Sequence, residues 1–113
     1  MLPKKEQLLV NESLGRYCEE RIPARVRDKV RLTYRWRGNT VTLIEERPYF
    51  QDPKRWTSLP VAQFRYDTGD KRWTLYCADR NSRWHLYDDA EPAVAIQSLL
   101  DEVNRDPTGI FWG

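Results

Sequence analysis

The sequence KVRLTYRWRGNTVTLIEER, residues 29–47, has the pattern of a β-hairpin. Apolar and polar residues alternate strictly over residues 29–37, which is typical of a strand with one buried face. Gly38 and Asn39 follow, and this pair between two alternating segments predicts a two-residue turn. Residues 40–47 are then the returning strand.

The two-residue turn determines which residues face each other across this hairpin. Arg37 faces Thr40, and the remaining pairs follow from the antiparallel register. The predicted pairs are Trp36 with Val41, Arg35 with Thr42, Tyr34 with Leu43 and Arg31 with Glu46. The hairpin is therefore expected to have one apolar face and one arginine-rich face.

Three more strands are predicted further along the chain, at about residues 61–66, 72–80 and 83–88, with turn residues between them. Residues 48–60 contain three prolines and are predicted to form a long loop. Its aromatic residues are Tyr49, Phe50 and Trp56. They either form a recognition loop or anchor the loop on the domain, and anchoring is the favoured interpretation.

A helix is predicted at each end of the chain. The first covers residues 4–21, because Pro3 suits a first turn and Pro23 ends the helix. Its apolar stripe is Val10, Leu14, Tyr17, Cys18 and Ile22. The second covers about residues 92–104, with an apolar stripe at helical spacing. That stripe is Ile96, Leu99, Leu100 and Val103.

Acidic residues and an apolar tail flank the second helix. Asp88, Asp89 and Glu91 are expected to complement the helix dipole, which explains them better than a site for a hard cation. The tail, residues 107–113, either docks into a partner or packs back over the helix and sheet. Packing back is favoured, because a free apolar tail would leave an exposed patch.

These elements predict an α+β domain of two layers. Both helices must bury one apolar stripe, so both are expected on the apolar face of a five-stranded antiparallel sheet. That face is predicted to hold Val30, Leu32, Tyr34, Trp36, Val41, Leu43, Ala62, Phe64, Tyr66, Trp73, Leu75, Cys77, Trp84 and Leu86. A length of 113 residues corresponds to a single domain.

Composition restricts the class of protein. Two cysteines do not form a disulfide framework, and the first residues lack the apolar core of a secretory signal, so a cytoplasmic protein without a membrane span is expected. Charge is uneven along the chain: residues 21–83 carry fifteen bases and seven acids, whereas residues 84–113 carry one base and six acids. This asymmetry indicates either an anionic partner or an acidic segment folded against a basic one.

Six dispersed motifs resemble, in order, a bacterial family of small proteins named domain of unknown function 3024. They are YCEERIP (17–23), VRDKVRL (26–32), RGN (37–39), ERP (46–48), RWHLYD (83–88) and DPTGIFWG (106–113). The resemblance covers the chain from about residue 14 to its end. It implies a bacterial, single-domain protein and brings no activity, cofactor or catalytic residue with it.

The sheet face opposite the core is the first candidate for a functional surface. It is predicted to carry seven arginines and one carboxylate, Glu46, with interleaved aromatic residues. The residues expected to contact an anionic partner are Arg31, Arg35, Arg65, Arg72, Tyr76, Arg83, His85 and Tyr87. Arginines bind phosphate, and aromatic rings on a sheet stack unpaired bases, so single-stranded nucleic acid or structured RNA is the first partner.

Three other interpretations of this face stay open. In the first, the face is a solvated surface on which Arg31 pairs with Glu46. In the second, the acidic C-terminal segment covers part of the face. Alternatively, the face is a homodimer or protein interface, because Arg and Tyr are enriched at such interfaces and Ile44, Val61 and Ala78 add apolar area.

Catalysis has less support in the sequence than binding. Cys77 and His85 are predicted to point to opposite faces, so they form no dyad, and His85 is expected to contact Tyr87 or Arg83. Glu45 is expected on the core face, near its rim or beside an arginine. With one histidine, no Gly-rich phosphate loop and no metal motif, no cofactor or metal is expected. The sequence therefore favours a non-catalytic binding module over an enzyme.

Overall fold

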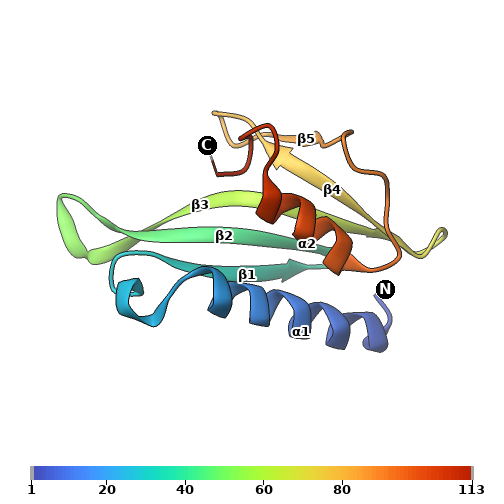
Figure 1. Cartoon of the computed structure of the whole chain (residues 1–113), viewed down its shortest axis with the longest axis horizontal. Helices are drawn as coiled ribbons and strands as arrows, with labels where there is room; N and C mark the ends of the chain where they lie inside the picture. Colours follow the sequence, from blue (N-terminus) through green and yellow to red (C-terminus); the bar gives the residue numbers. More distant parts are fainter. Residues whose placement is uncertain (1, 113) are drawn as a thin grey trace.

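The computed structural model describes residues 2–112 of the chain (Figure 1). Helix α1 (Lys4–Arg21) and the 3₁₀ helix η1 (Ala24–Val26) come first. The strands are β1 (Arg31–Arg37), β2 (Thr40–Tyr49), β3 (Asp52–Asp67), β4 (Arg72–Ala78) and β5 (Trp84–Leu86), and helix α2 (Ile96–Arg105) follows.

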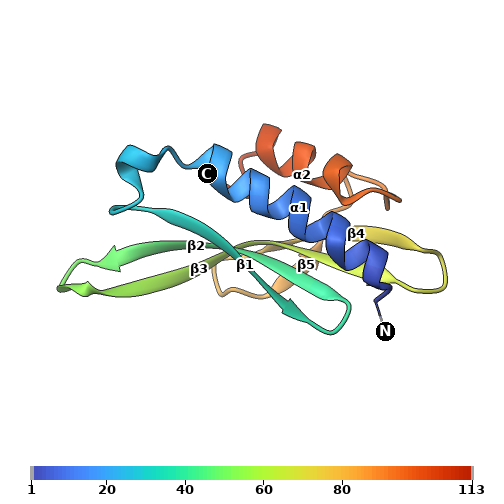
Figure 2. The same cartoon turned by 90° about the horizontal axis from the view of Figure 1, so that it is seen from below.

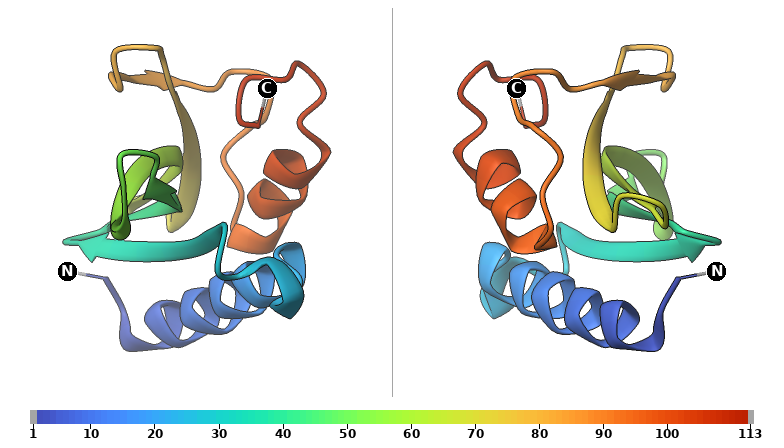
Figure 3. Two further views of the ribbon diagram at one scale, coloured as in Figure 1. Left: turned by 90° about the vertical axis from the view of Figure 1, so that its left-hand side faces the viewer. Right: turned by 90° about the vertical axis from the view of Figure 1, so that its right-hand side faces the viewer.

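The five strands form one open antiparallel sheet in the order β1-β2-β3-β4-β5. Each strand pairs with the next one in sequence, so the sheet is a meander. Both helices lie on the same side of it, and the sheet twists strongly between β1 and β5 (Figures 2 and 3). The predicted α+β fold is therefore confirmed. Neither helix has the length and hydrophobicity that crossing a bilayer requires.

The hairpin of β1 and β2 has the register that the sequence predicts. Arg37 faces Thr40 across the two-residue turn, and Arg31 faces Glu46 at the other end. The φ angle of Gly38 is +58°, a conformation that glycine adopts at little cost. The predicted assignment of β1 and β2 side chains to the two faces of the hairpin is therefore confirmed.

The prediction of a loop over residues 48–60 is wrong. β2 and β3 continue as a two-stranded arm whose turn is Phe50-Gln51, and this arm forms one end of the molecule (Figure 1). Pro48 and Pro60 lie within the strands, where the neighbouring β1 and β4 no longer pair with them. Proline is tolerated there because its missing N–H would have had no ladder partner on that side.

The predicted register between β4 and β5 is also wrong. Cys77 faces His85 and Ala78 faces Trp84, one residue away from the pairing that a two-residue turn at residues 81–82 would give. The turn is longer because the Asp79 carboxylate accepts the backbone N–H groups of Asn81 (2.8 Å) and Arg83 (3.0 Å), and the φ of Ser82 is +60°. A shift of one residue moves every side chain to the other face of the sheet.

Three predictions change with this register. Trp84 and Leu86 leave the core, and Leu86 is 56% exposed. Tyr87 enters the core and is only 5% exposed. His85 lies on the same side as Cys77, where its Nε2 contacts Asp79 Oδ2 at 2.8 Å rather than Tyr87 or Arg83.

Helix α2 begins at Ile96, about one turn later than the sequence predicts. Ala93 instead pairs with Trp73 of β4, exchanging both backbone hydrogen bonds at 2.9 and 2.7 Å. The backbone before Ile96 is therefore extended. Asp88, Asp89 and Glu91 precede the helix by too much to lie in its first turn, so the dipole explanation for them is wrong.

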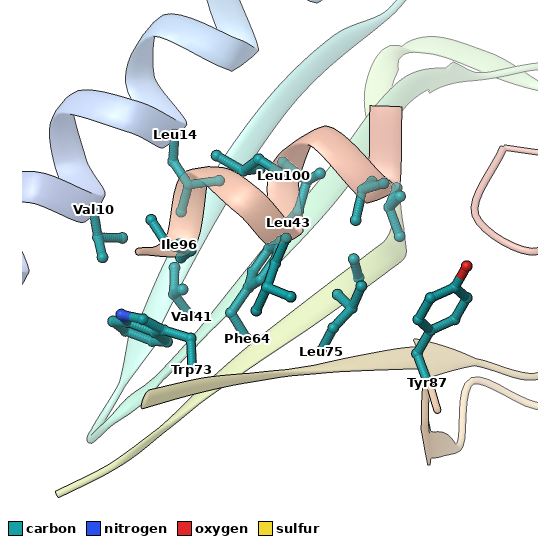
Figure 4. Packing of buried hydrophobic residues seen from close by; sticks show 14 of the residues in the cluster. Val10, Leu14, Val41, Leu43, Phe64, Trp73, Leu75, Tyr87, Ile96 and Leu100 are labelled. Atoms are coloured by element: carbon teal, nitrogen blue, oxygen red, sulfur yellow. The ribbon is translucent and has the colours of Figure 1, made fainter. Parts of the chain in front are cut away.

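The core lies between the sheet and the two helices (Figure 4). Trp73 and Phe64 are its largest fully buried side chains. Val10 and Leu14 enter from α1, and Leu100 enters from α2 with the rest of the predicted stripe. Val61, which the sequence places on the outer face, belongs to the core because β3 has a bulge at this point.

The apolar tail packs back on the domain, as the sequence favours. The Asp106 carboxylate accepts the backbone N–H groups of Phe111 (3.0 Å) and Trp112 (2.9 Å). Phe111 is buried, and the Trp112 indole N–H donates to the Val103 carbonyl at 3.0 Å. The described part of the tail therefore closes one end of the core.

A buried polar contact ties α2 to the chain after β5. The Tyr87 hydroxyl donates to Glu102 Oε2 at 2.6 Å, and Arg105 also contacts this carboxylate. These two donors lower the pKa of Glu102. Burial and the adjacent carboxylate raise the pKa of Tyr87, so the phenol stays protonated and continues to donate.

We predict that Tyr87→Phe lowers the free energy of unfolding by about 1–3 kcal/mol, because a buried carboxylate loses a donor. Urea denaturation followed by circular dichroism measures the loss. Tyr49→Phe is the matched control, since the Tyr49 hydroxyl contacts only the exposed Gln51. Equal losses in the two variants would contradict the assignment.

The pH dependence of this loss has a defined sign. Stabilisation from Glu102 is complete above the pKa that the carboxyl has in the unfolded chain. It disappears as the pH falls through the lower pKa of the folded state. The difference between wild type and Tyr87→Phe is therefore expected to shrink in acid. A difference that stays constant from neutral pH to acid would refute the role of Glu102.

Candidate functional site

The sheet face opposite the helices, called here the outer face, carries polar rows that run across the strands. One row is Arg37, Thr40, Arg65 and Thr74, and the next is Arg35, Thr42, Gln63 and Tyr76. Within residues 2–112, no helix lies over this face (Figure 2). The side chains of these rows are therefore available to a partner.

An open depression of about 610 Å³ lies on the outer face over β1, β2 and β3. Arg35, Arg37 and Arg65 line it, together with threonines and Gln63. Ile44 is only 7% exposed and contributes to the same lining. None of the described residues that line the depression is a carboxylate, so its charge is positive.

Glu46 is the carboxylate that the sequence predicts on this face, and it is already engaged. Its side chain is 15% exposed and accepts from Arg31 Nε at 3.3 Å and from Ser58 Oγ at 3.2 Å. Arg35 lies farther away, at 4.0 Å. The expected contact between Arg31 and Glu46 is confirmed, whereas within residues 2–112 Arg37, Arg65 and Arg72 form no ion pair.

Two arginines of the outer face place their guanidinium groups over aromatic rings. The Arg31 guanidinium carbon is 3.8 Å from the centroid of the Trp56 ring. The Arg65 guanidinium carbon is 3.7 Å from the centroid of the Tyr76 ring. Trp56 is not among the residues that the sequence places on this face, because the prolines of its segment predict a loop. The sequence feature that indicates its position is the alternation of side chains along a strand, which puts Ser58 and Trp56 on the same face.

The structure brings together only part of the predicted site. Arg31, Arg35, Arg65 and Tyr76 share the outer face. Arg72 lies at its margin, opposite Asp67. Arg83 is in the turn before β5, His85 is on the other side of the sheet, and Tyr87 is in the core.

The arm also differs from its predicted roles. Phe50 at its tip is 83% exposed and contacts the Tyr49 ring edge-on at 5.1 Å, so it anchors nothing on the domain. Trp56, by contrast, is half-buried beneath Arg31. Glu45 accepts from Arg47 Nε at 2.9 Å, as the sequence indicates.

The acidic C-terminal segment does not cover the outer face. Helix α2 and the chain before it lie on the opposite side of the sheet, with Asp101 and Glu102 on the helix (Figures 2 and 3). The interpretation that this segment shields the arginines is therefore wrong. The acidic residues of this segment instead lie on the side of the sheet away from the outer-face arginines.

No catalytic constellation is apparent among the described residues. Burial raises the pKa of the Cys77 thiol, and its Sγ contacts the His85 backbone carbonyl at 3.6 Å rather than the imidazole ring. Burial also raises the pKa of the Cys18 thiol, to about 11. Thiols of this kind are largely protonated at neutral pH. Residues 2–112 contain no group of three or more side chains placed to hold a metal ion.

Comparison with known proteins gives one assignment. The family described as Domain of unknown function (DUF3024) matches residues 2–113. No curated protein and no solved structure gives a significant match. The match spans nearly the whole chain and agrees with the resemblance of its six motifs, so this chain belongs to the DUF3024 family.

Proposed function

We propose that this chain is a non-catalytic binding module whose outer face binds nucleic acid through its phosphates. The observation that carries the proposal is the depression lined by Arg35, Arg37 and Arg65 on a sheet face that no described helix covers. We place the protein in the bacterial cytoplasm, where such a surface meets RNA and DNA.

The chemistry of the lining suits an oxyanion such as phosphate. The planar guanidinium group presents donors in a fork that matches two phosphate oxygens. Thr40, Thr42 and Gln63 add neutral polar groups at the same place. Glu46 is engaged by Arg31 and lies 4.0 Å from Arg35, and among residues 2–112 no carboxylate pairs with Arg37 or Arg65.

Separation of charge supports the same proposal. The outer face is basic, whereas acidic residues 88–106 belong to the helical side. A polyanion that approaches the molecule is attracted by one side and repelled by the other. The sheet would therefore orient the protein on its ligand before any close contact forms.

We predict that Arg35→Glu combined with Arg65→Glu abolishes binding to labelled single-stranded DNA, duplex DNA and RNA, measured by fluorescence anisotropy. Wild-type affinity should fall linearly with the logarithm of salt concentration. Single replacements by Gln should reduce that slope by about 0.7–0.9 for each phosphate that the variant no longer neutralises.

The matched control is Arg16→Glu combined with Arg25→Glu. It changes the net charge equally, but Arg16 is on α1, paired with Glu12, and Arg25 is in η1. This control should retain most of the binding. If wild type binds none of the three ligands at low salt, or if both double variants lose binding equally, the proposal is wrong.

A protein-interaction or homodimerisation module that uses the same face is the second candidate. Leu86 is 56% exposed opposite Tyr76, which gives the β5 end of the outer face an apolar surface. We predict for this candidate that light scattering gives twice the monomer mass, and that Leu86→Asp restores the monomer. A monomer at all concentrations would exclude the homodimer.

A further inference from the structure

We propose that the nucleic acid is unpaired, and that its bases stack on two guanidinium–aromatic pairs, Arg31–Trp56 and Arg65–Tyr76. This inference rests on the proposed function and specifies the ligand of the same face. It follows from an arrangement that occurs twice on the outer face.

In the first pair, Arg31 reaches from β1 over an indole of the arm. Its Nε donates to Glu46 Oε1 at 3.3 Å, and its guanidinium carbon is 3.8 Å from the Trp56 centroid. The Arg31 side chain is 47% exposed. The guanidinium is therefore positioned by Glu46 at its Nε and by the Trp56 ring on one face, and its remaining surface is accessible to a ligand.

The second pair repeats this arrangement at the centre of the sheet. Arg65 Nε donates to Gln63 Oε1 at 2.7 Å, and the guanidinium carbon is 3.7 Å from the Tyr76 centroid. Gln63 is in turn fixed by donating to Thr42 Oγ1 at 3.1 Å. Both arginines are thus anchored through Nε, and no residue in the range 2–112 accepts from their terminal Nη groups.

An anchored guanidinium on a ring is suited to an exposed base. Bases stack on aromatic rings and on guanidinium planes when they are not already stacked within a duplex. The free Nη groups can donate to the phosphate of the same nucleotide. A duplex offers its phosphates to this face but keeps its bases inside, so it would use only part of the surface.

The distance between the pairs fits an extended strand. Thr42 faces Gln63 and Pro48 faces Trp56, so six residues of β2 separate the two levels. At about 3.3 Å per residue, this separation is roughly 20 Å. A single strand that follows β2 and β3 would therefore meet the Arg31–Trp56 pair at one end and, at the other, the Arg65–Tyr76 pair at the positive depression that Arg65 lines.

The helical side offers a comparison of the same chemistry. Arg21 lies over Trp112 with its guanidinium carbon 4.4 Å from the ring centroid. There a terminal Nη1 group, rather than Nε, is engaged, because it donates to Asn104 Oδ1 at 3.2 Å. This pair joins α1 to the tail, which makes Trp112 a matched control for Trp56.

The first test is quenching of intrinsic tryptophan fluorescence by a short oligouridylate, compared with the same strand paired to oligoadenylate. We expect quenching by the single strand, loss of most of it in Trp56→Phe, and no such loss in Trp112→Phe. In Trp56→Ala the affinity for the single strand should fall by about 5- to 150-fold. Circular dichroism checks that each variant is folded.

A second pair of variants separates stacking from charge. Arg31→Lys combined with Arg65→Lys retains both positive charges and removes both planar groups. We expect weaker binding of oligouridylate with an unchanged salt slope, whereas Arg16→Lys combined with Arg21→Lys should have no effect. This test remains decisive if Trp56→Ala does not fold.

The outcomes distinguish this inference from the proposed function. Equal affinity for single strand and duplex, with the lysine variant unaffected, overturns base stacking and leaves phosphate binding by the outer face. Loss of binding in the lysine variant with a reduced salt slope also overturns stacking. Absence of any binding in wild type overturns the proposed function itself.

Discussion

Alternation of side chains along β1 and β2 is the constraint on which the rest of the molecule depends. Because successive residues point to opposite faces, Trp36 and Val41 can join α1 and the core only if Arg35 and Thr42 point away. The burial that stabilises the domain therefore exposes the arginines. One register establishes both the core and the candidate binding surface.

The two helices complete this division. The indole N–H groups of Trp36 and Trp73 donate to Asn11 and Glu6 of α1, at 3.0 and 3.4 Å, so the helix is fixed to the sheet by polar as well as apolar contacts. Ala93 occupies the free edge of β4 before α2 begins. These polar groups on the core side are thus satisfied within the domain, whereas Arg35 and Arg37 at the outer depression are exposed to solvent.

Sequence patterns predict the structure correctly where the residues of the element itself determine its geometry. Gly38-Asn39 gave the hairpin register, and the helical spacing of Ile96 to Val103 gave the buried stripe of α2. They do not predict the register of β4 and β5, where hydrogen bonds to a side chain determine the length of the turn. The Asp79 carboxylate accepts two backbone N–H groups, and the turn between β4 and β5 is one residue longer than predicted. This shift places Tyr87 in the core instead of the predicted site, and it places Trp84 outside the core. Pro48 and Pro60 made the arm unpredictable from sequence. Whether a strand tolerates a proline depends on which neighbouring strands pair with it, and this is a property of the tertiary structure.

The arm gives the molecule two regions of unequal stability. Beyond Glu46 it is a two-stranded ribbon, and its residues contribute nothing to the main core. An isolated ribbon of this kind is marginally stable in water. Its order therefore depends on contacts at its junction with the domain, among them Arg31 with Trp56 and Glu46 with Ser58. The arm would open and close by local unfolding while the core stays intact, so backbone amides at its end would exchange with solvent far faster than those of β3 beneath the helices. A ligand held across this junction would then select the closed arm, and part of its binding free energy would be used to order the protein.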